Sequence, residues 1–178
     1  MMKKLIIPML ILALISTQTK ALEEYISVPA LTTIWVERPT DTDDYRLISH
    51  ISNRYGIQLE KAEEIVEVAK VAADDEFPTH TDILAIVAIE SKFKQYAKNK
   101  NSRAKGLMQI LYKPSSFEVQ KNMEDGTNLL KTYDRLLKGN KDATIQAYNV
   151  GIGAYLAGKR NKDYLNRFKQ AHKQLEQA

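Results

Sequence analysis

One carboxyl group stands where its surroundings could give it acid-base chemistry. Glu90 directly follows the run Ile83 to Ile89, which is apolar at every position. Burial at the end of such a run disfavours the charged form of a carboxyl group and raises its pKa. A group of this kind can be protonated near neutral pH and act as a general acid. The residues alone leave an alternative open, in which Glu90 reaches the surface and pairs with Lys94 four positions later.

The segment that positions Glu90 is predicted to be a buried helix. It begins after Pro78 with Thr81 as the expected N-cap, and it is apolar on every side of a helical wheel, which is typical of a buried helix. A central strand is the other interpretation of Ile83 to Ile89. The chain shows no alternating partner strands, which favours the helix.

Other helices are predicted where apolar residues recur at three-to-four spacing. These predicted helices cover residues 44–55, 59–75, 117–138, 142–148 and 162–177. Gly126 is expected to interrupt the third of them, and residues 94–106 are expected to form a polar loop. The sequence therefore predicts an all-α fold.

The N-terminal residues resemble a secretory signal peptide. Lys3 and Lys4 precede an apolar stretch over residues 5–15, and Thr19 and Ala21 provide small residues before a cleavage point. An uncleaved anchor or a buried helix is the alternative, but the stretch is shorter than the roughly 20 residues that span a bilayer. We expect residues 1–21 to be removed, leaving an exported protein with no stable membrane anchor, in the periplasm or the cell wall. Residues 22–44 are expected to form an irregular arm, so that residues 22–77 comprise this arm and two amphipathic helices.

The net charge of +4 is unevenly distributed along the chain. Residues 22–89 contain 5 basic and 14 acidic residues, whereas residues 90–178 contain 18 basic and 8 acidic residues. Export and the lack of a recognisable motif argue against a nucleic-acid partner. The densest basic cluster comprises Lys92, Lys94, Lys98, Lys100, Arg103, Lys105, Lys113 and Lys121. Such a cluster indicates either a cationic margin that attracts an acidic polymer or simply solvated surface.

Metal and thiol chemistry are not expected. The chain has no cysteine, and its three histidines, His50, His80 and His172, lack the spacing of metal ligands. We therefore expect neither a metal site nor a cofactor.

Three ordered motifs resemble those of one enzyme family. The motifs are Glu90-Ser91, then Gly106-Leu107-Met108-Gln109, then Ala147-Tyr148-Asn149-Val150-Gly151. Together they resemble the signatures of the soluble lytic transglycosylase (SLT) catalytic domain, which is related to goose-type lysozyme. The resemblance covers roughly residues 78–168, and it implies a lysozyme-like helical domain over residues 78–178 with a saccharide cleft.

The resemblance also implies an activity. Family members cleave the β-1,4 bond between N-acetylmuramic acid and N-acetylglucosamine in peptidoglycan glycan strands. One glutamate, matched here by Glu90, acts first as acid and then as base, and the product carries a 1,6-anhydromuramoyl end. Two alternatives are a hydrolytic muramidase on the same scaffold and a non-catalytic peptidoglycan-binding or assembly protein. Wall remodelling, a secretion or conjugation apparatus, and a phage assembly are all compatible settings.

Similarity assigns expected roles to further side chains. Substrate-binding roles are expected for Ser91, Met108, Gln109, Tyr148, Asn149 and Tyr164. Ser91 would bond near Glu90 or the substrate, and Tyr164 matches a family tyrosine that contacts the catalytic glutamate. One departure is Arg103, which stands where the family usually has glycine, so the turn must accept a side chain that could face the cleft. A second is Leu111-Tyr112-Lys113, which lengthens the approach to Pro114 in the same wall.

Overall fold

The polar and apolar spacing of the chain produces a bundle of helices around one buried helix. The computed structural model describes residues 42–111 and 116–178, and the described residues belong to a single compact unit. Its helices are α2 (Thr42–Tyr55), α3 (Leu59–Ala72), α4 (His80–Glu90), α5 (Val119–Leu136), α6 (Lys141–Val150), α7 (Ile152–Leu156) and α8 (Lys162–Glu176). These described residues form no strand, which agrees with the predicted all-α fold. The predicted signal segment and nearly all of the predicted arm lie outside the described residues.

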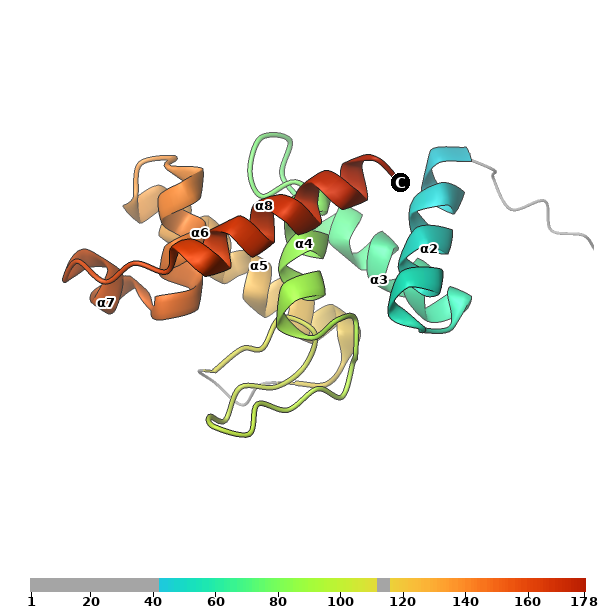
Figure 1. The fold of residues 1–178 in the computed structure, drawn as a ribbon, viewed down its shortest axis with the longest axis horizontal. Coiled ribbons are helices and arrows are strands. Elements are labelled where there is room, and N and C mark those ends of the chain that lie inside the picture. Colours follow the sequence, from blue (N-terminus) through green and yellow to red (C-terminus); the bar gives the residue numbers. More distant parts are fainter. Residues whose placement is uncertain (1–41, 112–115) are drawn as a thin grey trace, which may run out of the picture. The chain divides into compact units, whose positions relative to one another are not determined.

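Helix α4 forms the centre of the fold, as its apolar sequence predicts. Residues Ile83 to Ala88 are all buried, and α4 packs against α8 on one side and α3 on another. In Figure 1 the red helix α8 crosses the green α4, and α6, which contacts α8, lies beside it. Burial of this apolar run removes a large area from water and favours folding. The last residue of this buried helix is Glu90.

The start of α4 differs from the prediction. Its N-cap is Thr79, so the expectation of Thr81 was wrong. The Thr79 hydroxyl accepts the Asp82 N–H at 3.2 Å, and the Asp82 carboxylate accepts the Thr79 N–H at 3.0 Å. This reciprocal capping box satisfies two backbone donors that a helix otherwise leaves unpaired. The spacing Thr79-x-x-Asp82 was visible in the sequence and was the better N-terminal signal.

Two smaller differences concern helices near the predicted cleft. Gly126 does not interrupt α5, which is continuous from Val119 to Leu136. Its missing side chain instead makes room for Met108, because a Cβ atom at position 126 would overlap the Met108 side chain. The short helix α7 was not predicted; it follows Gly151, whose φ of +83° allows the chain to turn between α6 and α7.

Asp82 also joins three helices through its contacts with two basic side chains. Its carboxylate is fully buried, and its Oδ1 lies 2.7 Å from Nζ of Lys141 on α6 and 3.1 Å from Nε2 of His172 on α8. Burial opposes the charged form, but the bonds from His172, Lys141 and the Thr79 N–H outweigh it and lower the pKa of Asp82. The charged carboxylate therefore stabilises the fold.

Replacing Asp82 with asparagine is expected to lower the free energy of unfolding at pH 7 by about 2–3 kcal/mol, because the cap weakens and Lys141 and His172 lose their charged partner. Since the folded-state pKa is lowered, the wild-type stabilisation is present above the ordinary aspartate pKa and is lost as the pH falls through the folded value. Urea unfolding from pH 7 to pH 3 should show a shallower acid dependence for Asp82→Asn. The exposed Asp142→Asn is the matched control, and an equal loss there would contradict this account.

Candidate active site

Glu90 opens onto a cleft with a cavity volume of about 360 Å³. The walls come from residues 99–111, from α5, and from the C-terminal end of α6 with Gly151. Four of the predicted site residues line it: Glu90, Gln109, Tyr148 and Asn149. The structure therefore brings together residues from all three motifs, although they are separated by up to 59 positions in the chain.

The central contact of the cleft is between Glu90 and Tyr164. The Tyr164 hydroxyl donates to Glu90 Oε1 at 2.6 Å, and the tyrosine side chain of α8 is buried. Burial raises the pKa of Glu90, although the Tyr164 bond and the nearby Arg167 favour its charged form. The pKa of Tyr164 lies well above its ordinary value, chiefly because of burial, so the phenol stays neutral and keeps its proton to donate. Burial thus favours the protonated form of Glu90, and the Tyr164 bond supports the carboxylate that is left when a general acid gives up its proton.

Tyr148 joins α6 to the opposite wall. Its hydroxyl donates to the main-chain carbonyl of Met108 at 2.7 Å. The Met108 side chain is fully buried and does not line the cavity; it packs against Gly126 of α5. The structure therefore places the Met108 side chain in the core below the cleft and uses its carbonyl to hold Tyr148.

The Gly106 to Gln109 segment is fixed by a buried asparagine of α5. The Asn122 side chain accepts the Met108 N–H at 2.8 Å and donates to the carbonyls of Lys105 at 3.1 Å and Ser116 at 2.9 Å. Gly106 has a φ of +84°, and a Cβ atom there would overlap Asn122. Glycine is required at this position both for the left-handed backbone and for the close approach of Asn122.

Gln109 and Ser91 use their polar groups on the protein itself. The Gln109 amide donates to the carbonyls of Gly106 at 2.8 Å and Ala97 at 3.2 Å, and its φ of +51° places it in the left-handed region. Such strain in a residue other than glycine is often found at functional sites. Ser91 is buried and donates to the Val87 carbonyl at 3.1 Å, outside the residues that line the cleft.

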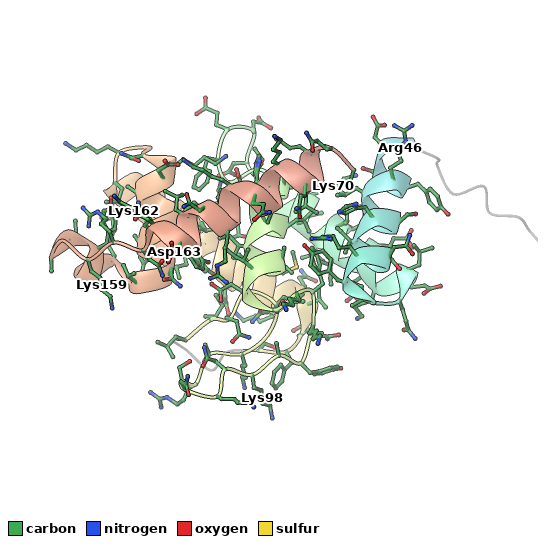
Figure 2. All side chains as sticks on the ribbon, viewed as in Figure 1. Arg46, Lys70, Lys98, Lys159, Lys162 and Asp163 are labelled. Atoms are coloured by element: carbon green, nitrogen blue, oxygen red, sulfur yellow. The ribbon has the colours of Figure 1, made fainter. Side chains whose placement is uncertain are left out.

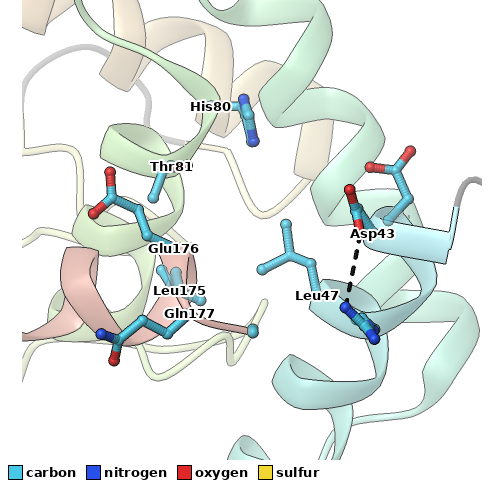
Figure 3. A pocket seen from close by; sticks show the side chains of 10 residues that line it. Asp43, Leu47, His80, Thr81, Leu175, Glu176 and Gln177 are labelled. Carbon is cyan, nitrogen blue, oxygen red and sulfur yellow. Dashed lines mark ion pairs between the residues drawn. The ribbon is translucent and has the colours of Figure 1, made fainter.

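A second and larger cavity, of about 440 Å³, lies between the N-terminal ends of α2 and α4 and the C-terminal end of α8. Figure 3 shows Leu47 and His80 at its edge, with an ion pair between Asp43 and Arg46. None of the three motifs contributes a residue to it. Chemistry rather than size therefore selects the Glu90 cleft as the candidate active site.

A comparison with known families identifies the fold that carries this cleft. The model of the transglycosylase SLT domain matches residues 68–171, which is more than half of the chain. The chain belongs to the SLT family. Neither a curated protein nor a solved structure matches the chain at a significant level.

Membership in the SLT family confirms the resemblance and the all-α, lysozyme-like fold class that it implied. It also implies a transglycosylase-type enzyme that acts on peptidoglycan. The matched region begins within α3 and ends within α8, so it contains Glu90, the cleft and Tyr164. Among the described residues, no helix is both long enough and apolar enough to cross a membrane.

One residue that the motifs did not reveal, Asn161, connects two parts of the SLT site. Asn161 accepts the Tyr164 N–H at 2.9 Å as the N-cap of α8, and its Nδ2 donates to Asn149 Oδ1 at 2.7 Å. The Asn161 side chain thus links Tyr164, which supports Glu90, to Asn149 in the cleft wall. The sequence signal was weak, because an asparagine before Lys-Asp-Tyr indicates a helix start but not what lies across from it.

Other cleft residues were also absent from the predicted set. Asn99 and Ser102 line the cavity from the polar loop, and Tyr133 lines it from α5. Arg103, which replaces the usual glycine, is exposed, has no positive φ and is not among the lining residues. The turn therefore accepts this side chain without left-handed backbone and keeps it out of the cavity wall.

Proposed function

We propose that this protein is an exported lytic transglycosylase that cleaves the β-1,4 bond between N-acetylmuramic acid and N-acetylglucosamine. The observation that carries the proposal is the Glu90–Tyr164 pair at the floor of the cleft in an SLT domain. Glu90 is the one carboxyl group among the described residues that line the cleft. That suits a reaction in which a single glutamate serves in turn as acid and base, with the substrate's own N-acetyl group taking the place of a second carboxylate.

The proposed reaction consumes no water. Protonated Glu90 gives its proton to the glycosidic oxygen, and the bond between that oxygen and C1 of the muramoyl residue breaks. The N-acetyl group of the same residue stabilises the positive charge at C1. Glu90, now charged, removes the proton of the C6 hydroxyl, and O6 bonds to C1 to form the 1,6-anhydro ring. The proton returns to Glu90, and the leaving sugar ends in a hydroxyl group.

The neighbours of Glu90 support both halves of this cycle. Burial raises the Glu90 pKa and keeps the acid form available. The 2.6 Å bond from Tyr164 then stabilises the carboxylate that forms when the proton leaves. Because Tyr164 is already in place before the reaction, no reorganisation is needed as the charge develops.

The other predicted residues take two kinds of role in this proposal. Gln109, Tyr148 and Asn149 line the cleft and contact the sugars, with Asn149 as the most exposed donor and acceptor of the three. Ser91 and Met108 lie outside the cleft lining and support it. The Ser91 hydroxyl donates to the Val87 carbonyl at the end of α4, and the Met108 carbonyl accepts the Tyr148 hydroxyl. Binding through the Met108 side chain is not part of the proposal.

The chemical outcome of the reaction tests the proposal. Purified peptidoglycan digested with the protein should release muropeptides with anhydromuramoyl ends, which mass spectrometry detects as one water lighter than hydrolysed products. Products at the hydrolysed mass would instead establish a muramidase on the same scaffold. No released product from a folded protein would favour a non-catalytic binding role.

A further inference from the structure

The loop that forms one cleft wall also has a second, outward face. Lys98 and Lys105 form an isolated antiparallel bridge, and the Asn99 N–H donates to the Ala104 carbonyl at 3.0 Å. In paired extended segments, successive side chains point to opposite faces. Asn99 and Ala104 line the cleft, whereas Lys98 and Lys105 do not line it and contact the Phe117 ring instead, so the two lysines lie on the reverse of the same wall. Figure 2 shows Lys98 on this loop.

The outward face carries an aromatic ring shared by both lysines. Nζ of Lys105 lies 4.9 Å and Nζ of Lys98 lies 5.6 Å from the centre of the Phe117 ring. The Tyr96 ring lies 5.7 Å from the same ring, and Tyr96 is 72% exposed. The amide of Gln95 donates to the Phe117 carbonyl at 2.8 Å and holds the Phe117 main chain just before α5. We call Tyr96, Lys98, Lys105 and Phe117 the outer platform.

The charges of the outer platform are arranged for an anion. Like charges directly opposite each other across a paired segment repel and destabilise it. Within the described part of the chain, neither Lys98 nor Lys105 forms an ion pair with a carboxylate. The Phe117 ring attracts both cations but carries no net charge, so it offsets only part of the repulsion. A carboxylate placed between the two ammonium groups would convert this repulsion into two charge-assisted hydrogen bonds.

We propose that the outer platform is a binding site for a carboxylate of a peptidoglycan stem peptide. This inference rests on the proposed function, which supplies peptidoglycan as the substrate. The sugars occupy the inner face of the loop, so a group that reaches the outer face must hang from the glycan, as a stem peptide does, or belong to a neighbouring strand. Lys98 and Lys105 bind the carboxylate, and the exposed Tyr96 contacts the apolar part of the peptide.

The test compares binding to peptidoglycan with and without its peptide carboxylates. The full chain carrying Glu90→Gln, which leaves the polymer intact, is titrated onto immobilised peptidoglycan. The same titration is repeated on peptidoglycan whose stem carboxylates have been amidated, and on glycan stripped of peptides by an amidase. Adding Lys98→Gln and Lys105→Gln together should weaken binding to the untreated polymer about tenfold. On the amidated and stripped polymers the same pair of substitutions should change binding less than about twofold.

A matched control separates a specific site from loss of positive charge. Lys159 and Lys173 are exposed and form no ion pair within the described residues. Lys159→Gln with Lys173→Gln removes the same charge and should leave binding within about twofold on all three polymers. The proposal would be overturned if both pairs of substitutions weakened binding equally. It would also be overturned if the Lys98 and Lys105 substitutions still weakened binding to the stripped glycan.

Measuring enzyme activity tests this proposal independently of the proposed function. With Glu90 intact, the Lys98→Gln and Lys105→Gln protein should release anhydro products from peptide-free glycan at the wild-type rate. If the protein releases anhydro products but its binding does not depend on peptide carboxylates, the proposal for the outer platform is wrong and the transglycosylase proposal is retained. If binding depends on peptide carboxylates but no anhydro products form, the transglycosylase proposal is wrong and the proposal for the outer platform is retained.

Discussion

Replacing Glu90 with glutamine is expected to reduce release of anhydromuropeptides at least about a thousandfold. Glutamine is nearly the same size and can still accept the Tyr164 hydroxyl, but it can neither give nor take a proton. General acid-base catalysis commonly contributes a factor of about 10² to 10⁴, and here one group performs both transfers. Product formation is measured by mass spectrometry at fixed enzyme concentration, with circular dichroism to show that the variant is folded.

The same substitution is expected to stabilise the protein. Because the folded-state pKa of Glu90 is raised, the folded protein binds more protons than the unfolded chain between the ordinary pKa of 4.5 and the folded value. The contribution of Glu90 to stability therefore falls as the pH rises through that interval. Glutamine carries no such penalty. We expect the unfolding midpoint of Glu90→Gln to exceed that of the wild type by about 2–4 °C at pH 8, and the difference to shrink below about pH 4.5.

Glu124→Gln is the matched control for both measurements. Glu124 is an exposed carboxylate on α5 whose Oε1 accepts from Gln120 at 2.8 Å, and it does not line the cleft. Its substitution should leave both activity and the unfolding midpoint close to the wild-type values. A Glu90→Gln protein that is inactive yet less stable at pH 8 would show that Glu90 is held in its charged form, against the raised pKa.

The predicted residues that the structure places in the cleft are those that stand out by their own chemistry or by a local motif. Glu90 stood out because a carboxyl group directly after an all-apolar run is expected to lose water, and its motif favoured the cleft over the surface. Gln109, Tyr148 and Asn149 were assigned to the cleft through their motifs. The buried helix that ends at Glu90 was likewise predictable from its apolar residues alone. In each case the decisive information lies within a few neighbouring positions.

What the sequence did not predict depends on contacts between distant segments. Asn122 looks like an ordinary polar residue of α5, and only the fold shows that it fixes the Gly106 to Gln109 segment. Gly126 looks like a helix breaker until Met108 is seen to occupy the space of its missing side chain. The inward direction of Met108 follows from the same packing. Spacing along the chain carries no information about which residue lies across a helix interface.

Asn161 is the clearest case, and its loss should affect catalysis strongly. It spans the gap between Tyr164, which supports Glu90, and Asn149 on the other wall. Asn161→Ser keeps an N-cap oxygen for α8 but is too short to reach Asn149. We expect it to unfold close to the wild-type temperature while kcat/KM for peptidoglycan falls about 10- to 100-fold, because small displacements of catalytic groups cost rate steeply.

Asn161→Ala and Asn140→Ala separate the two roles of this side chain. Asn161→Ala should show the same loss of kcat/KM and a further loss of about 1 kcal/mol in unfolding free energy, because the cap is removed. Asn140 caps α6 by accepting the Ala143 N–H at 3.0 Å and does not line the cleft. Asn140→Ala should therefore lose similar stability and keep most of its activity.

The pH dependence of the Asn161→Ala enzyme, which lacks the bond to the Tyr164 N–H, gives the readout that a purely structural role would not change. If Asn161 holds Tyr164 against Glu90, its loss weakens the bond that favours the charged carboxylate, and the pKa of Glu90 rises further. The acid form then persists to higher pH, so the alkaline limb of the kcat/KM profile should move upward, while the base step slows. A profile that matches the wild type, with activity also unchanged, would show that Asn161 only caps α8 and that Tyr164 is held in place by its own burial.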